Sequence, residues 1–250
     1  MFEPPADHSR SGLTAVRYTR GVEHSEAPVG GGCFITVEGP DGAGKTTQAG
    51  ALADYLRRRG KAVLLTREPG GTWLGERVRE LLLARTGSAA ATDPVTDAIL
   101  FSAARRQLVT EVIRPALAGG RTVICARYAD STLAYQGYGA GVLLERLRVL
   151  EALATDGLRP HLTFLLDLPV ESGLARKAPG DMTRFEAEFD LPFHRRVRDG
   201  FLALATASPE RFVVVDATRS AEEVATAVNA AADRLLGSGE PKPLAARTTR

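Results

Sequence analysis

The 250-residue sequence lacks several features that would point to particular classes of protein. Its two cysteines, Cys33 and Cys125, each lie in an apolar run, which favours buried, reduced thiols over a disulfide framework and predicts a cytoplasmic protein. No apolar stretch approaches the ~20 residues that span a bilayer, so we expect no membrane partner. The formal net charge of +2 gives no reason to expect a nucleic-acid surface.

Lysine is also scarce. Of the 32 basic residues, lysine accounts for Lys45, Lys61, Lys177 and Lys242, so nearly all the positive charge is carried by arginine. A guanidinium is planar and can bind phosphate through two parallel hydrogen bonds, which would suit a protein that handles phosphate groups. Codon bias would produce the same skew, and composition does not separate the two explanations.

The two ends of the chain differ from its middle. Residues 1–32 and 237–250 are rich in Gly, Pro and mixed charge without a sustained apolar period, so we predict a disordered N-terminal extension and a disordered tail. An upstream start codon chosen in error is the alternative for the first segment, whose acidic residues and lack of an apolar centre argue against a targeting peptide. Residues 33–236 have the length of one globular domain.

Strand-like and helix-like patterns alternate within this domain. Continuous apolar runs, typical of strands buried on both faces, occur at 33–37, 62–66, 122–126, 162–166 and 212–215. Helical stripes lie between them: Ala49, Leu52, Ala53 and Leu56; Leu143, Leu147, Leu150 and Ala154; and Val224, Val228, Ala231 and Leu235. We expect Gly60 to end the first helix and Ser220 to cap the last. The pattern predicts a doubly wound α/β fold, a five-stranded parallel sheet with helices on both faces and ligand sites at the carboxyl ends of the strands.

A phosphate-binding loop follows the first predicted strand. Residues 39–46 read Gly-Pro-Asp-Gly-Ala-Gly-Lys-Thr and fit the pattern G-x-x-x-x-G-K-S/T directly before a helix. Such a loop turns its backbone N–H groups toward phosphate oxygens, with Lys45 reaching the β- and γ-phosphates and Thr46 binding Mg²⁺. A glycine-rich turn without a ligand is the alternative. The predicted ATP-phosphate contacts are Gly39, Pro40, Asp41, Gly42, Ala43, Gly44, Lys45, Thr46 and Thr47.

Four motifs, in order along the chain, indicate what the second substrate is. The segments 38–48, 66–72 (Thr-Arg-Glu-Pro-Gly-Gly-Thr), 100–105 and 127–137 resemble the successive signatures of bacterial thymidylate kinases, from about Cys33 to about Leu236. The resemblance implies a P-loop nucleoside monophosphate kinase-like fold. It also implies transfer of the ATP γ-phosphoryl group to dTMP with Mg²⁺ as cofactor, and a homodimer formed through helices outside the sheet.

The resemblance assigns roles around the phosphate and sugar of dTMP. It implies that Arg79 and Arg127 clamp the acceptor phosphate, that Asp41 approaches the 3′-hydroxyl, and that Tyr135 crowds the 2′ position. Without the motifs, Arg79 would be a solvated helix arginine and Tyr135 a packing residue.

Further roles concern the base. The resemblance implies that Phe101 stacks on thymine and Arg105 donates to the base edge, with Ser131 and Gln136 as polar contacts nearby. The alternatives are a core position for Phe101 and a surface position for Arg105.

Two departures from the family pattern bear on catalysis. Ala126 stands where family members commonly carry an aspartate that helps organise Mg²⁺, and Glu68, Asp130 or Asp167 could replace it. This change leaves open a nucleotide-binding relative with weakened catalysis. A kinase for another pyrimidine nucleoside monophosphate is the other alternative function.

The second departure lies in a short lid around residues 176–185, where Thr183 replaces the usual aspartate. Because Gly42 occupies a loop position where some relatives carry arginine, we expect a lid cation to reach the transferring phosphate. Arg176 and Arg184 are the candidates, with Lys177 third, and a solvated charge run is the alternative. The predicted catalytic residues are therefore Lys45, Arg127, Arg176 and Arg184.

Overall fold

The computed structural model describes residues 31–85, 92–178, 180 and 182–237. The predicted extension and tail lie outside these ranges except for residues 31, 32 and 237. Within the described ranges no helix has the length and apolarity needed to cross a membrane.

The sheet has the predicted architecture. Its strands are β1 (Phe34–Glu38), β2 (Val63–Arg67), β3 (Thr122–Ala126), β4 (Leu162–Asp167) and β5 (Phe212–Asp216), in the order β2-β3-β1-β4-β5. Every pairing is parallel. Each predicted strand begins and ends within one residue of the observed one. Burial on both faces is confirmed for β1, β3 and nearly all of β4, but it is wrong for the edge strands β2 and β5, which are buried only in part.

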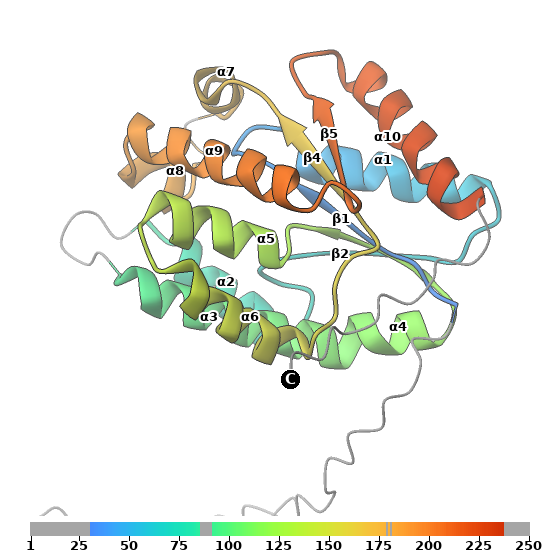
Figure 1. Ribbon diagram of the computed structural model, residues 1–250, viewed down its shortest axis with the longest axis horizontal. Coiled ribbons are helices and arrows are strands. Elements are labelled where there is room, and N and C mark those ends of the chain that lie inside the picture. Colours follow the sequence, from blue (N-terminus) through green and yellow to red (C-terminus); the bar gives the residue numbers. More distant parts are fainter. Residues whose placement is uncertain (1–30, 86–91, 179, 181, 238–250) are drawn as a thin grey trace, which may run out of the picture.

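Helices cover both faces of this sheet (Figure 1). They are α1 (Lys45–Arg58), α2 (Trp73–Leu83), α3 (Pro94–Leu108), α4 (Arg114–Ala118), α5 (Ala129–Thr132), α6 (Leu144–Thr155), α7 (Val170–Ala175), α8 (Arg184–Glu188), α9 (Leu191–Ala207) and α10 (Ala221–Gly237). Two π-helical turns, η2 (Val109–Ile113) and η3 (Leu133–Gly139), extend α3 and α5. The helices α1 and α10 enclose one apolar core with the sheet, and the opposite face packs against α3, α4, η3 and α9.

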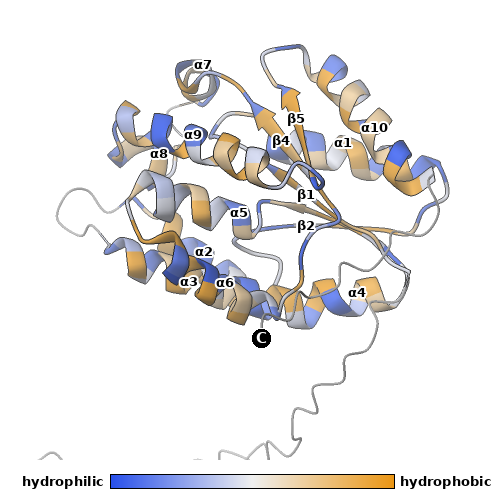
Figure 2. Cartoon of the chain, viewed as in Figure 1, coloured by the Kyte–Doolittle hydropathy of each residue, from blue (hydrophilic) through white to orange (hydrophobic). Residues whose placement is uncertain are grey.

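Apolar residues follow this layering, with strands that are apolar along their length between helices of mixed polarity (Figure 2). The predicted stripe of α1 is fully buried, and Val224, Val228 and Ala231 of α10 are buried as well. The expectation for Leu143 is wrong: this residue precedes α6 as its N-cap and is 62% exposed. The helical spacing of apolar residues predicted that Leu143 faces the core, but α6 begins one residue later.

Local signals at the helix ends are confirmed. Gly60 follows the C-cap of α1 with φ of +76°, the left-handed conformation that glycine adopts without steric cost. Ser220 and Glu223 exchange hydrogen bonds at the start of α10, as in a capping box. Both cysteines are free and buried, Cys33 on the α1 side of the sheet and Cys125 on the other.

Candidate functional site

A cavity of about 360 Å³ opens at the carboxyl ends of the central strands, where a parallel sheet normally holds its ligands. The phosphate loop, the end of β2, helices α2 and α3, η3 and the lid all contribute to its wall. Most predicted site residues line it: Asp41, Gly42, Gly44, Lys45, Thr46, Thr47, Arg79, Phe101, Arg105, Arg127, Ser131, Tyr135, Gln136 and Arg176. Gly39, Pro40, Ala43 and Arg184 do not line it.

The phosphate loop connects the end of β1 to the start of α1. Gly44 is the N-cap residue of α1 with φ of +86°, and a Cβ on Gly42 would lie 1.8 Å from the carbonyl oxygen of Gly173. An arginine therefore does not fit at position 42 of this loop. Thr46 and Thr47 are exposed in the first turn of α1, so their hydroxyls and the helix N-terminus are free to face phosphates.

Lys45 lies in this loop without an ionic partner within hydrogen-bond distance in the described structure. Its Nζ donates to the carbonyl oxygen of Pro40 at 2.6 Å. Burial, followed by the nearby Arg127, lowers the pKa of Lys45 to about 7. A bound polyphosphate would favour the charged ammonium, so the loop is suited to an anionic ligand.

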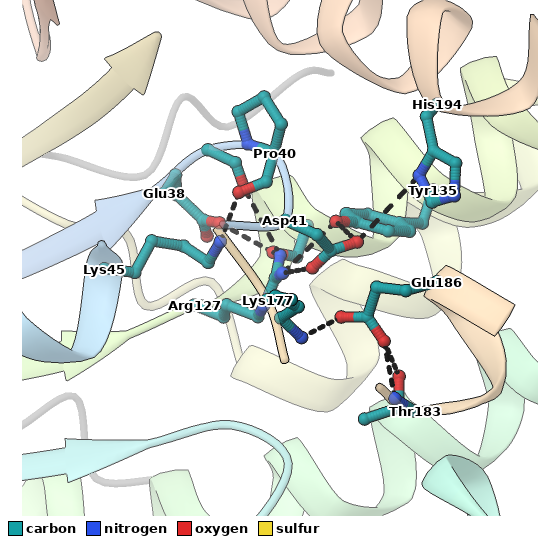
Figure 3. Close-up of polar contacts among 12 residues, drawn as sticks. Glu38, Pro40, Asp41, Lys45, Arg127, Tyr135, Lys177, Thr183, Glu186 and His194 are labelled. Carbon is teal, nitrogen blue, oxygen red and sulfur yellow. Dashed lines mark hydrogen bonds and ion pairs between the residues drawn. The ribbon is translucent and has the colours of Figure 1, made fainter. Parts of the chain in front are cut away.

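Arg127 lies at the centre of a hydrogen-bonded cluster beside the phosphate loop, close to Lys45 (Figure 3). Its Nη2 donates to Asp41 at 2.5 Å and to the Tyr135 hydroxyl at 3.2 Å, and its Nη1 donates to Ser131 Oγ at 3.2 Å. The Tyr135 hydroxyl in turn donates to Asp41 at 2.7 Å. Burial alone would raise the pKa of Asp41, but Arg127 and Lys45 hold it below its ordinary value. The cluster therefore presents a fixed guanidinium beside an ionised carboxylate.

A second arginine lies deeper in the cavity wall. Arg105 is 1% exposed; its Nε donates to Glu68 at 2.7 Å, and its Nη2 donates to Thr132 Oγ1 at 3.0 Å. The Nη1 atom of Arg105 and the Oε1 atom of Glu68 are buried without a hydrogen-bond partner among the described residues. Phe101, one turn earlier on α3, lines the same cavity with its ring 6.1 Å from that of Phe185. An aromatic ring next to a fixed cation can hold a planar, polar base.

Arg79 and Gln136 complete the predicted acceptor side. Arg79 is half-buried and donates from Nη1 to the carbonyl oxygen of Pro69 at 3.0 Å. Burial and the neighbouring Arg67 lower its pKa from the ordinary value. Gln136 is buried on η3 and lines the cavity.

The three basic residues of the lid are bound less uniformly than Arg105 and Arg127. Lys177 pairs with Glu186, which also accepts a hydrogen bond from the Thr183 N–H at 2.7 Å. Arg176 is exposed at the cavity. Arg184 lies outside the cavity wall, contrary to its predicted position. Its Nε donates to the carbonyl oxygen of Leu82 at 2.5 Å and its Nη2 lies 2.7 Å from Asp97 Oδ1. This buried ion pair holds Arg184 away from the cavity, so Arg176 and Lys177 remain the lid candidates.

The acids proposed to replace the missing aspartate at position 126 are mostly bound elsewhere. Asp130 accepts two hydrogen bonds from Arg211, and Asp167 accepts two from Arg198. Glu68 lines the cavity but pairs with Arg105. No group of three or more acidic, histidine or cysteine side chains that could hold a metal occurs in the described residues. The Thr46 hydroxyl is exposed at the cavity, which fits an Mg²⁺ ion bound mainly by nucleotide phosphates and water.

The sequence did not single out Thr132 and Phe185, which line this cavity, or Glu38, which lies outside the lining but is hydrogen-bonded to two residues that line it. Glu38 is completely buried at the end of β1, and Thr132 accepts from Arg105. The signal for Glu38 was a single carboxylate that ends an apolar strand directly before the phosphate loop, an unusual position for a charge.

The sheet order, the phosphate loop at the end of the central strand and the arginines that share its cavity define a P-loop nucleotide kinase of the nucleoside monophosphate type. The Thymidylate kinase family profile matches residues 37–228. Thymidylate kinase from Deinococcus radiodurans is 55% identical over 201 residues, covering 80% of this chain and 96% of that protein. The enzyme from Thermomicrobium roseum is 52% identical over 212 residues, covering 84% and 99%. The crystal structure of thymidylate kinase from Ehrlichia chaffeensis superposes with a TM-score of 0.63 at 36% identity, covering 82% and 98%. The chain belongs to the thymidylate kinase family.

Proposed function

We propose that the chain transfers the γ-phosphoryl group of ATP to the 5′-phosphate of dTMP, giving dTDP and ADP. The observation that carries the proposal is that one cavity contains a phosphate loop with Lys45, the Arg127 cluster bonded to that loop, and both Phe101 and Arg105. This arrangement suits two anionic nucleotides that meet with their phosphates in line. Positioning and charge stabilisation then supply most of the catalysis, because phosphoryl transfer needs no covalent enzyme intermediate.

The residues divide by the ligand they would hold. Lys45, Thr46 and the backbone of the loop face the ATP phosphates, and Arg127 with Arg79 faces the acceptor phosphate. Mg²⁺, when bound through Thr46 and the nucleotide, neutralises phosphate charge. Lys177 and Arg176 lie on the lid, where closure would bring a cation to the transferred group and exclude water.

An ADP-release assay with ATP, Mg²⁺ and a panel of monophosphates tests this function. We expect turnover with dTMP well above the water background and lower values of kcat/KM with dUMP, dCMP and dGMP. Turnover with another pyrimidine monophosphate but not with dTMP would favour the first alternative. ATP binding without transfer to any acceptor would favour the catalytically weakened relative.

We also propose a homodimer formed through α2, α3 and α6. These helices pack side by side outside the sheet and expose large apolar side chains, namely Leu81 (69% exposed), Ile99 (51%), Val149 (72%) and Leu153 (73%). Light scattering should give twice the monomer mass for the wild type and the monomer mass for Leu153→Glu. The matched control is Val214→Glu on β5, at the opposite edge of the sheet from β2, which should stay dimeric. The cytoplasmic location expected from the sequence stays a prediction.

A further inference from the structure

A buried carboxylate at the end of β1 has no role in the function proposed above. Glu38 is 0% exposed, although a buried charge is costly unless it is well bonded. Both of its oxygens are bonded to the segment that follows β3. Oε1 accepts the N–H of Tyr128 at 2.6 Å, and Oε2 accepts the hydroxyl of Ser131 at 2.6 Å (Figure 3 shows Glu38 beside the cluster). The carboxylate thus joins the strand before the phosphate loop to the turn that carries Arg127.

That turn has a strained backbone. Arg127 has φ of +69°, in the left-handed region that a residue with a side chain rarely adopts. Such a conformation is costly and persists only where its surroundings hold it. The hydrogen bond from Tyr128 N–H to Glu38 comes immediately after the strained residue, and Arg127 N–H donates to the carbonyl oxygen of Val37. The end of β1 therefore holds the backbone of Arg127 on both sides.

The same carboxylate also holds the side chain of Arg127, but indirectly, through Ser131. Burial raises the pKa of Glu38 to about 7, while the hydrogen bonds from Ser131 and Tyr128 and the nearby Arg127 favour its ionised form. The Ser131 hydroxyl has a single proton, and the ionised carboxylate accepts that proton in a short contact. The lone pairs of Ser131 Oγ then face Arg127 Nη1, which donates to it at 3.2 Å. Glu38 in this way fixes Ser131 as an acceptor, and Ser131 fixes one edge of the guanidinium, while Asp41 binds the other nitrogen.

We propose that Glu38 and Ser131 are positioning residues that hold Arg127 in the orientation needed to clamp the acceptor phosphate. The inference rests on the proposed function, because it takes Arg127 as the phosphate clamp. It changes the role of Ser131: the residue expected to contact the base acts through Arg127 on the phosphate. Glu38 and Asp41 lie at the two sides of Gly39 and Pro40, so the donor loop and the acceptor clamp form one hydrogen-bonded unit.

Calorimetric binding of two probes, dTMP and thymidine, separates the two roles of Ser131, because thymidine has the base and sugar but no phosphate. We expect Ser131→Ala to weaken dTMP binding about tenfold, the scale of one hydrogen bond to a charged group, and to leave thymidine binding unchanged. Glu38→Gln should have the same signature, because glutamine has one accepting oxygen, and its amide nitrogen only donates, so it cannot accept from both Tyr128 and Ser131. Equal weakening of dTMP and thymidine binding would overturn the proposal and would mean that Ser131 contacts the base.

A double-mutant cycle gives an independent test. In an Arg127→Lys background, which keeps the charge but loses the Nη1 contact, Ser131→Ala should have no further effect on dTMP binding. Additive losses would mean that Ser131 acts independently of Arg127 and would contradict the proposal. Ser131→Thr keeps the hydroxyl and should restore dTMP affinity; if Glu38→Gln fails to fold, the serine variants still decide the result.

Thr36→Val is the matched control. Thr36 is a fully buried hydroxyl residue on the same strand, and its Oγ1 lies 2.9 Å from Thr163 Oγ1 rather than near Arg127. Its loss should lower thermal stability without changing the ratio of dTMP to thymidine affinity. A wild-type protein that does not prefer dTMP over thymidine would contradict the proposed function itself. A preference that all the serine and glutamate variants retain would contradict only the positioning role.

Discussion

The acceptor side of the cavity and the lid hold their cations in opposite ways. Arg105 and Arg127 are each fixed by several protein partners, including one carboxylate each, before any ligand is present. On the lid, Lys177 has the single partner Glu186, and the exposed Arg176 has no side-chain hydrogen bond or ion pair among the described residues. Fixed cations need no reorganisation when charge arrives, whereas lid cations can follow the ligand. The proposed acceptor site is thus preorganised, and we expect the final geometry of the lid to depend on the ligand.

The largest effect should come from breaking a fixed cation. Arg105→Ala leaves Glu68 as a buried carboxylate without its partner, which typically costs about 3–5 kcal/mol of unfolding free energy. Arg176→Ala, on the exposed lid, should change stability by less than about 0.5 kcal/mol. Urea denaturation of both variants measures the difference. Similar stabilities would contradict the distinction between the two sides.

The pH dependence of the Arg105→Ala variant has a definite sign. Burial already raises the pKa of Glu68 to about 7, with Arg105 opposing the shift. Without the arginine the pKa rises further, so above the unfolded-state pKa the folded variant holds a proton that the unfolded chain has released. Its stability must then fall with increasing pH up to the raised pKa. We expect the deficit relative to wild type to be larger at pH 8 than at pH 6, and a constant deficit would exclude Glu68 as the cause.

The next effect concerns the phosphate loop. Lys45→Met should lower kcat about 100- to 1,000-fold by removing a charge aimed at the transferred group. The melting temperature should stay close to that of the wild type, because burial already disfavours the charged amine and a thioether chain fits the same space. Lys61→Met, at an exposed position before β2, is the matched control and should keep full activity. Loss of folded protein with unchanged activity per folded molecule would contradict the catalytic role.

Substitutions at Phe101 test the proposed base pocket, which lies beside Arg105. Phe101→Ala should weaken dTMP binding by about 1–3 kcal/mol, the range of base–aromatic stacking, and leave ATP binding unchanged. Phe101→Leu keeps apolar volume without the ring, so it should recover stability more than dTMP affinity. Calorimetry with both nucleotides measures the effect. Equal losses of ATP affinity and dTMP affinity would mean that Phe101 only packs against Phe185.

The contrast between the two sides also explains what the sequence could predict. The strands and the phosphate loop were predictable because their signals are local: continuous apolar runs and one short motif. The position of Arg184 was not, because its carboxylate partner Asp97 lies on α3, far along the chain, and a buried pair looks like a surface charge run in sequence. The same limit hid the bond between Glu38 and Ser131. Whether a charged residue faces a ligand or a protein partner is decided by tertiary contacts.

The smallest effect should come from restoring an acid at position 126. Ala126 is 5% exposed and lines the cavity at the end of β3, next to Arg127. Ala126→Asp should lower the magnesium concentration for half-maximal rate by about three- to tenfold, a modest case of the change that acids around a metal produce. A bound cation would keep the new carboxylate ionised, so any loss of stability should disappear when Mg²⁺ and nucleotide are added. Ala126→Asn has the same size without the charge and should leave the magnesium dependence unchanged. If Ala126→Asp also leaves it unchanged, the ion is already held by the phosphates, Thr46 and water, and the position does not face it.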